Sequence, residues 1–447
     1  MADLIINSSE ESLIDSLNFK LPTTSQYVTD RRLVRFYPSG ASDFSPNGVR
    51  TARVLLSGDG GWVDPSSLRI GFKLQNMSAD ANLYLAAGPH CLIERIRIFV
   101  SGTLVEDLGP HYGRMHELFQ HRLTPQNRNL NTGIMNNMMN YNPNWFDTAQ
   151  NMEAAPLAPG YSATVHMPIA CGFLKTGKYL PVRYASVQLE ITFANAEDAV
   201  VLDAVHHSAG AAAVAGSRDY AIRQLTVFCA QSRLDSALEQ SFAQLLLSNR
   251  ALTVPIRTVA TQVQTIPDGS TNFQVSLVRA LSRMNAVFVS FTWETPDGEG
   301  VTRPHAHPVA TFSMPSSTEE GSGGGMNHRE HTMAMQVQIG SKLTPETECS
   351  SMGEFFDNLQ QAVDVYDQSL RSLAITPRMY KTHSFIAGFN LCRVPGHFAS
   401  GINTRTGDLL VIKAKNVLPG TRNLRCYVNI LYEGILEIRE SGCSFCD

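Results

Sequence analysis

The chain contains 447 residues, with 36 Lys and Arg against 40 Asp and Glu, so its formal net charge is −4. Hydrophobic residues make up 43% and charged residues only 17%, against about 25% charged residues in an average protein. The apolar content excludes a disordered chain, and the lack of a basic excess argues against a protein that wraps nucleic acid by itself. No apolar run approaches the ~20 residues of a membrane-spanning helix.

Residues 1–18 are predicted to form an N-terminal arm. Ser8 and Glu11 fit the helix-capping box, and apolar residues follow on one helical face. A helix this short is marginal alone, so we expect it to order only against the body of the protein or a neighbouring subunit. The segment is acidic and lacks the basic start of a secretory signal, so we expect a protein that is not secreted. The few scattered cysteines favour reduced residues in a protein made in a cytosol or nucleus.

From residue 19 onward, apolar residues recur with the period of two that is typical of strands with one buried face. The strands predicted in the first half are 32–37, 53–57, 68–74, 83–87, 92–100, 161–169, 186–193 and 221–230. A short helix is predicted at Arg114–Leu123, with Met115, Leu118, Phe119 and Arg122 along one side.

Residues 126–159 are rich in Asn, Met and Pro and have no clear period. Long unpatterned loops inside compact domains are usually functional or form interfaces. Exposed Met and aromatic side chains would be unusual on a monomer, so we interpret this loop as covered by a neighbouring subunit. The alternative is a loop folded over its own domain.

The second half repeats the organisation of the first. A linking helix is predicted at 234–249 and a second helix at 352–373. The predicted strands are 253–256, 257–265, 273–278, 286–293, 331–339, 383–393, 409–415 and 425–440. Short strands separated by turn signals, without a regular βαβ alternation, favour an all-β chain with short helices that is built from antiparallel sandwiches. We partition it into residues 19–232 and 233–447, the second unit including the linking helix and a C-terminal tail.

No catalytic motif is present, and we expect no catalytic, cofactor-binding or metal-binding residue. His305 and His307 have the spacing of a metal-binding pair on a strand, but the carboxylate that such sites need does not follow and Pro304 and Pro308 favour a loop. His328 and His331, like His206 and His207, lie in stretches of small residues that are typical of solvated loops.

The eight cysteines are scattered and too sparse for a disulfide framework. Cys443 and Cys446 form a C-x-x-C pair without the second pair that a structural zinc site usually has. We interpret them as tail cysteines. The alternative is a bond to a neighbouring subunit in an oxidising environment.

The order of these features resembles the double jelly-roll major capsid proteins of icosahedral double-stranded DNA viruses of the nucleocytoplasmic large DNA virus, virophage and polinton-like kind. Four stretches carry the resemblance: LIERIRIFVSGTLVEDL (92–108), MQVQIGSKLTPETECSSMGEFFDNLQQAV (335–363), FIAGFNLCRVPGHFASGINT (385–404) and YVNILYEGILEIRESG (427–442). The resemblance implies two tandem eight-stranded antiparallel jelly rolls and a structural protein of the virion, without catalysis.

The resemblance further implies a homotrimer that forms a pseudo-hexagonal capsomer and tiles the shell through capsomer–capsomer contacts. Minor capsid, cement and penton proteins would be its other partners, possible contact with an inner membrane is left open, and no sequence-specific nucleic-acid binding is expected. Loops 126–159 and 294–330 would form the outer tower, and residues 1–18 and 440–447 would lie at the base. Two alternatives are a secreted or surface carbohydrate-binding β-sandwich protein and a β-sandwich hydrolase or metal-dependent enzyme.

Overall fold

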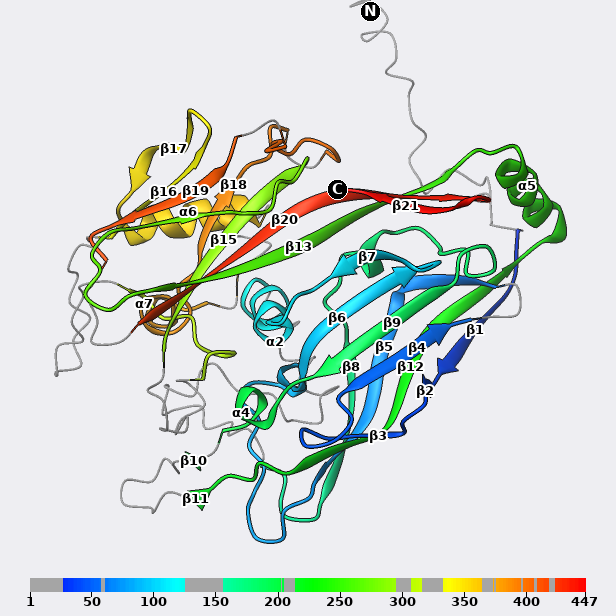
Figure 1. The fold of residues 1–447 in the computed structure, drawn as a ribbon, viewed down its shortest axis with the longest axis horizontal. Coiled ribbons are helices and arrows are strands. Elements are labelled where there is room, and N and C mark those ends of the chain that lie inside the picture. The colour runs from blue at the N-terminus through cyan, green and yellow to red at the C-terminus, as the bar shows by residue number, and fades with distance from the viewer. Residues whose placement is uncertain are drawn as a thin grey trace, which may run out of the picture.

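The computed structural model describes residues 27–57, 61–124, 156–201, 203–204, 214–294, 307–315, 333–363, 373, 375–394, 397–405, 408–417 and 423–447. The described residues form two β-sandwiches that lie side by side (Figure 1). Among them, no helix combines the length and apolar character needed to cross a membrane.

The first sandwich consists of two antiparallel sheets. One has the order β1 (Val28–Phe36), β12 (Tyr220–Leu234), β5 (Trp62–Asn76), β8 (Ser162–Pro168), with β3 (Asp43–Phe44) also on β12. The other has the order β2 (Pro38–Ser39), β4 (Thr51–Leu56), β9 (Val187–Phe193), β6 (Ile93–Val100), β7 (Thr103–Asp107). β10 (Asp203–Ala204) and β11 (Val214–Ala215) pair separately.

The second sandwich has the same plan. One sheet has the order β13 (Leu252–Ile266), β20 (Leu424–Arg439), β15 (Met284–Trp293), β18 (Ala387–Asn390), with β21 (Gly442–Cys446) also on β20. The other has the order β14 (Phe273–Ser276), β19 (Leu410–Lys415), β16 (Ala334–Ile339), β17 (Lys342–Cys349).

The strand order identifies both sandwiches as jelly rolls. When the eight principal strands of each are ranked along the chain, one sheet in both has the order 1-8-3-6 and the other 2-7-4-5. This interleaving of two Greek keys across facing sheets defines the jelly roll. The expected all-β fold with two tandem eight-stranded jelly rolls is confirmed.

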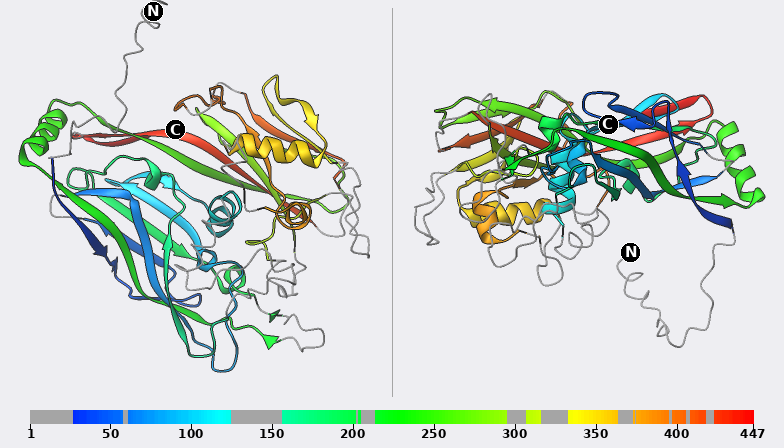
Figure 2. Two further views of the ribbon diagram at one scale, coloured as in Figure 1. Left: turned by 180° about the vertical axis from the view of Figure 1, so that it is seen from behind. Right: turned by 90° about the horizontal axis from the view of Figure 1, so that it is seen from below.

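Short helices fill the connections. They are η2 (Pro89–Leu92), α2 (Tyr112–His116), η3 (Glu117–Arg122), η4 (Phe173–Lys175), α4 (Ala196–Ala199), α5 (Ser236–Leu247), α6 (Met352–Ala362) and α7 (Pro377–Thr382). α5 connects the two sandwiches at one end of the molecule, and α6 packs against β18 on the second sandwich, as Figure 2 shows from behind. The predicted boundary between residues 232 and 233 falls within the last three residues of β12 and remains a proposal.

Several predicted elements need correction. Residues 83–87 do not form a strand, because Leu83 and Leu85 make only isolated bridges to Leu157 and Val200 and their side chains anchor a loop to the core. The helix predicted at 352–373 ends at Ala362, followed by a turn at Val363, and residues 364–372 lie outside the described residues. The arm 1–18 also lies outside them, as does all of loop 126–159 except its last four residues.

The C-terminal residues differ from the expected tail. Gly442–Cys446 form β21, which pairs with β20 and also lies against the first sandwich, where Oγ1 of Thr103 donates to the carbonyl of Cys443 at 3.1 Å. Asp447 then accepts from Arg279 and Arg405. Residues 440–447 are therefore built into the fold by ladder hydrogen bonds and ion pairs.

Candidate functional site: the joint between the two sandwiches

Two strands of the second sandwich also contribute side chains to the core of the first. Val254 and Ile256 of β13, with Leu436 and Ile438 of β20, pack into the apolar core of the first sandwich. The other ends of the same strands belong to the second core, and both strands run along the first sandwich in Figure 1. Burial of shared apolar surface opposes rotation of one sandwich against the other, because any rotation would expose it to water.

The helical segment of α2 and η3 also contacts both cores. The sequence predicts this helix at Arg114–Leu123, and the structure begins it at Tyr112 and ends it at Arg122, with π-helical hydrogen bonding in its second half. Met115 packs into the first core, whereas Leu118 and Leu123 pack into the second. We call α2, η3, residues 307–312 and the start of β13 the inter-sandwich joint.

Arg114 is the main polar element of the inter-sandwich joint. It is 3% exposed and reaches from α2 into the second sandwich. Its guanidinium group donates to four oxygen atoms there: the carbonyls of Pro308, Thr311 (2.6 Å) and Phe291 (3.2 Å) and the hydroxyl of Ser290 (3.1 Å). Burial lowers the pKa of Arg114 to about 10, so the group remains charged at neutral pH.

Aromatic rings take the place of a carboxylate beside Arg114. The guanidinium carbon lies 4.2 Å from the ring centroid of Phe312 and 4.2 Å from that of Tyr427. Cation–π attraction strengthens when the cation is shielded from water. The two ring faces and the carbonyl dipoles therefore offset the desolvation of the buried charge.

Arg122 makes a second connection from the same helical segment. It donates to Oγ of Ser384 at 2.8 Å and to the carbonyl of Ala310 at 3.1 Å, and its Nε lies 3.0 Å from Oε1 of Glu117. Burial alone would raise the pKa of Glu117, but His121 and Arg122 hold it well below its usual range. The carboxylate therefore remains ionised inside the protein.

Glu106 organises a third contact between the sandwiches. Its buried carboxylate at the end of β7 accepts from the backbone N–H groups of Gly172 (2.9 Å) and Phe173 (3.0 Å). It also accepts from the thiol of Cys171 and from the hydroxyl of Thr258 on β13. A carboxylate with these donors joins three separate segments, and charge-assisted hydrogen bonds are the stronger kind.

Residues 307–315 differ from the expectation for loop 294–330. The resemblance implied an outer tower, but Ala310 and Phe312 are buried between the sandwiches, where Ala310 belongs to the first core and Phe312 to the second. The reason is chemical, since this segment supplies the carbonyls that accept from Arg114 and Arg122. Residues 295–306 and 316–332 lie outside the described residues.

His307, one of the two histidines of the His305/His307 pair, has a structural role. Its ring is buried, with Nε2 3.2 Å from the carbonyl of Glu197 and Nδ1 accepting from the N–H of Val309 at 3.3 Å. Both nitrogens are satisfied in the neutral form that carries its proton on Nε2. His307 therefore attaches the joint to α4, while His305, His206, His207, His328 and His331 lie outside the described residues.

The burial of His307 predicts a pH dependence of stability. Burial lowers its pKa from 6.5 to about 4, so the folded state favours the neutral ring. This contribution to the free energy of unfolding is complete above pH ~6.5 and is lost as the pH falls toward 4, amounting to about 2–3 kcal/mol by pH 4.5. Denaturant unfolding of the wild type and of His307→Gln at pH 7.5 and 4.5 measures it. The wild type should lose more stability than the variant, and equal losses would refute the assignment.

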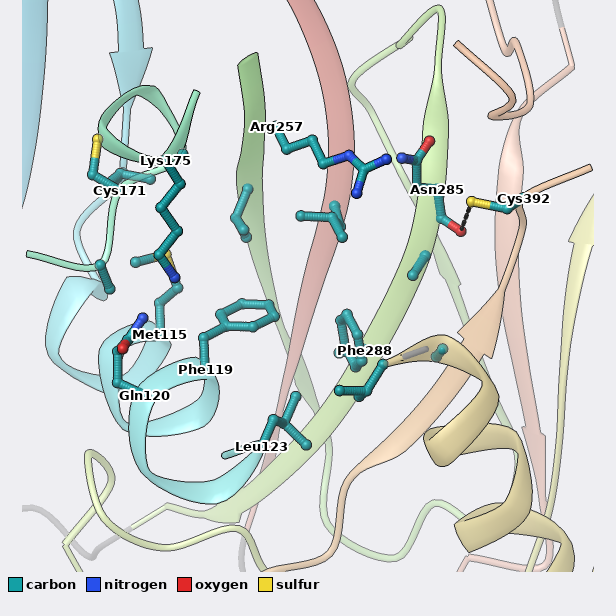
Figure 3. A pocket seen from close by; sticks show the side chains of 18 of the residues that line it. Met115, Phe119, Gln120, Leu123, Cys171, Lys175, Arg257, Asn285, Phe288 and Cys392 are labelled. Carbon is teal, nitrogen blue, oxygen red and sulfur yellow. Dashed lines mark hydrogen bonds between the residues drawn. The ribbon is translucent and has the colours of Figure 1, made fainter. Parts of the chain in front are cut away.

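A cavity of about 660 Å³ lies between the sandwiches beside the inter-sandwich joint. Figure 3 shows Met115, Phe119 and Leu123 on one side and Phe288 opposite them. The charged or polar side chains on its wall include Gln120, Lys175, Arg257 and Asn285. Nε of Arg257 and Nδ2 of Asn285 both donate to the buried carboxylate of Glu433, at 2.9 and 2.8 Å. Arg257 and Asn285 therefore tie β13 and β15 to β20 at the wall of the cavity.

The C-x-x-C cysteines lie on β21 and are not bonded to each other. Cys443 is partly buried and Cys446 is exposed. Residues three apart on a strand point to opposite faces of the sheet, so the strand geometry separates the two thiols. The described cysteines are all free.

Comparison with known proteins gives a result at the level of structure. No protein-family model matches the chain, and no curated protein sequence matches it. Among solved structures, PBCV-1 VP54, as fitted into a reconstruction of the virophage Sputnik, aligns with a TM-score of 0.62 and 13% identity over 96% of this chain and 98% of that chain.

Two further structures agree along the whole chain. The Faustovirus major capsid protein aligns with a TM-score of 0.63 and 8% identity over 96% of this chain and 93% of its own. A chain of the Sputnik virophage aligns with a TM-score of 0.59 and 9% identity over 98% and 92%. The chain has the double jelly-roll fold. Each alignment includes both sandwiches, so the likeness covers their relative placement as well as the fold of each one.

Sequence reasoning missed the residues that build the inter-sandwich joint. Arg114 and Arg122 fell within a correctly predicted helix, but arginine at a helix surface is normally solvated. Glu106 belonged to a stretch that carried the family resemblance, without any assigned role. His, Arg and Glu are dense in residues 111–122 (HYGRMHELFQHR), but charged residues between apolar ones at helical spacing are typical of an amphipathic helix with one solvated face, so this pattern did not reveal the burial.

Proposed function

We propose that this chain is the major capsid protein of an icosahedral double-stranded DNA virus and that its role is structural and not catalytic. The observation that carries the proposal is the pair of complete jelly rolls held in one orientation by the inter-sandwich joint, in an arrangement shared over nearly the full length with viral capsid chains. Three such chains would place six jelly rolls in a pseudo-hexagonal capsomer.

The rigidity of the inter-sandwich joint supports this assembly. In a ring of six sandwiches, three of the six contacts lie within chains, so an error in the angle at the joint would be repeated three times around the ring. Shared cores and buried Arg114 and Arg122 suppress such an error. An enzyme would have no comparable need for a fixed angle between two similar sandwiches.

Exposed apolar side chains supply candidate subunit contacts. Leu33 on the edge strand β1 and Tyr37 just beyond it are 67% and 65% exposed, and Tyr27 just before the strand is 60% exposed. Edge strands and exposed apolar side chains are common association surfaces. We assign this edge to contacts between copies of the chain.

The remaining parts of the proposal concern the finished particle. The protein would be made in the cytoplasm or nucleus of the host cell and reside in the capsid shell. Minor capsid, cement and penton proteins would complete the shell, and contact with an inner membrane stays open. These parts rest on the family resemblance of the sequence. No observation favours the carbohydrate-binding or enzymatic alternatives.

Native mass measurement of the purified chain tests the proposal. We expect a tight trimer of three 49.1-kDa chains, because obligate interfaces bury on the order of 2,000–5,000 Å² and persist on dilution. Negative-stain images should show pseudo-hexagonal particles. A monomer at every concentration would overturn the proposal.

A further inference from the structure

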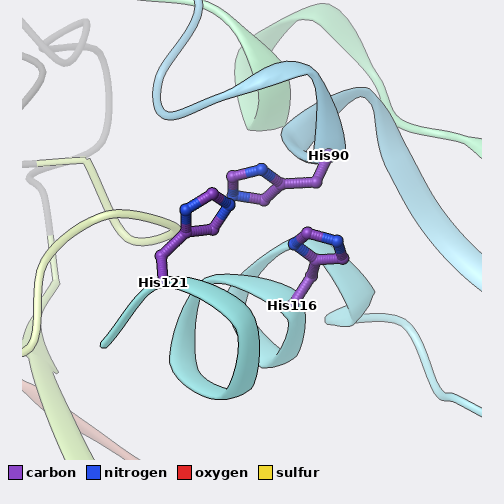
Figure 4. A group of neighbouring side chains, drawn as sticks. All are labelled: His90, His116 and His121. Carbon is purple, nitrogen blue, oxygen red and sulfur yellow. The ribbon is translucent and has the colours of Figure 1, made fainter. Parts of the chain in front are cut away.

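Three histidines converge in one buried cluster of the first sandwich. His90 belongs to η2, His116 ends α2 and His121 lies in η3, and all three are at most 5% exposed. One candidate ligand atom from each lies within 4.8 Å of the other two. Figure 4 shows the three rings close together, with the ring of His90 stacked against those of His116 and His121 at centroid distances of 4.5 and 4.8 Å. We call these residues the histidine cluster.

Two ring nitrogens of the histidine cluster lack hydrogen-bond partners. Within the part of the chain that the structure describes, Nδ1 of His90 and Nδ1 of His116 are buried without one. A buried polar atom with no partner costs about 1–3 kcal/mol, and it is rare in native proteins unless the site has a role. A ligand that accepts the lone pairs of the imidazoles would remove this cost.

Neighbouring groups engage Nε2 of His116 and of His90 and leave the Nδ1 atoms available as ligands. Nε2 of His116 lies 3.3 Å from the carbonyl of Pro168, which favours the proton on Nε2 and leaves the lone pair on Nδ1. Oε2 of Glu117 lies 3.1 Å from Nε2 of His90, and Arg122 holds the other carboxylate oxygen. A metal-binding histidine typically donates the N–H of its other ring nitrogen to a carboxylate or a backbone carbonyl.

The donor set identifies the class of metal. Three imidazoles, each neutral once it binds a metal, with a nearby carboxylate suit Zn²⁺, which forms four-coordinate sites with bonds of about 2.0–2.1 Å to His nitrogen. Ligand nitrogens around such an ion lie roughly 3.4 Å apart. The rings of His116 and His121, now at 17° and 27° to that of His90, would therefore have to rotate as well as shift by about an ångström to direct their lone pairs at one ion. Hard cations such as Ca²⁺ and Mg²⁺ require oxygen ligands and do not fit.

We propose that His90, His116 and His121 bind one Zn²⁺ ion that stabilises the fold. The ion would join η2 of the first sandwich to the helical segment that carries Arg114 and Arg122 into the second. It would therefore stabilise the inter-sandwich joint from within the first core. This inference is independent of the proposed capsid role, and it departs from the sequence-based expectation of no metal site.

Zinc analysis of the full-length protein tests the proposal. Protein purified without chelator should contain one Zn²⁺ per chain by elemental analysis. Chelator should lower the midpoint of thermal unfolding, and added Zn²⁺ should restore it because the ion binds only the folded site. Co²⁺ titrated into the chelated protein should give the visible absorption bands of a four-coordinate site.

Variants locate the ion. His116→Ala and His121→Ala should each abolish stoichiometric zinc, whereas His397→Ala, at an exposed position outside the histidine cluster, should retain it. Loss of zinc without loss of folded secondary structure supports the site. The Co²⁺ and Zn²⁺ titrations of the wild type keep the test valid if a variant fails to fold. Wild-type protein that binds neither ion and whose unfolding midpoint does not respond to them would overturn the proposal, and so would variants that keep their zinc.

Discussion

Gly172→Ala is expected to be the most damaging small substitution at the contact between the two sandwiches. A Cβ at this position would lie 1.5 Å from the carbonyl oxygen of Arg257 and 2.9 Å from Cα of Thr258. Both obstacles are backbone atoms of β13, so no side-chain rotation relieves the overlap. The backbone of the second sandwich must move away from the loop before η4.

The movement would also break the contacts of Glu106. The N–H groups of Gly172 and Phe173 and the hydroxyl of Thr258 all donate to its buried carboxylate, so separating them leaves buried polar groups unpaired. We expect a loss of about 3 kcal/mol or more in the free energy of unfolding, measured by denaturant unfolding. Trimer yield should fall in parallel.

Gly353→Ala is the matched control. Gly353 lies in the first turn of α6, and a Cβ there meets no atom within 4 Å. Alanine is also the better helix former, so stability should be unchanged or slightly increased. If Gly172→Ala unfolds at the same denaturant concentration as the wild type and Gly353→Ala, Gly172 is not in close contact with the backbone of β13.

Arg114→Met is expected to produce the second large effect. Methionine fills a similar volume but donates no hydrogen bond. The oxygen atoms of Ser290, Phe291 and Thr311 would therefore lose the guanidinium group that now donates to them. Removing one partner of a buried charged network typically costs about 3–5 kcal/mol. Denaturant unfolding should show this loss, and limited proteolysis should show faster cleavage between the sandwiches.

Two comparisons sharpen this experiment. Arg114→Lys keeps the charge but not the planar guanidinium group, so its free energy of unfolding should lie between those of the wild type and Arg114→Met. Arg439→Met removes a half-exposed arginine whose partner is Glu437 on the same strand, and its effect should stay within about 0.5 kcal/mol. Equal stability of Arg114→Met and Arg439→Met would show that the buried arginine is not needed to hold the sandwiches together.

The sequence predicted best where a local pattern and a tertiary environment agree. Val187, Leu189, Ile191 and Phe193 alternate in the sequence and are all buried on β9. Residues 83–87 show the limit of the same reasoning. An extended loop that places Leu83 and Leu85 in the core has the same alternation as a strand, because the period reports which side chains are buried and not whether the backbone finds a neighbour.

The inter-sandwich joint was beyond such reasoning for a physical reason. Arg114 and its acceptor Thr311 are separated by 197 residues, and Glu106 and Thr258 by 152. No local period encodes a contact at that distance. Likewise, the histidine cluster joins His90 to His116 and His121 across β6 and β7, whereas sequence inspection favours closely spaced pairs such as His305 and His307.

The sequence by itself determined the all-β class, the two similar halves, the linking helix and the near-neutral charge, since these follow from composition and from patterns within ten or twenty residues. Only the tertiary structure decided that β13 and β20 serve both cores, that residues 307–312 are buried in the joint, and that arginine, glutamate and histidine side chains meet there. Burying a charged or polar group requires partners on every side, and those partners come from segments that only folding brings together.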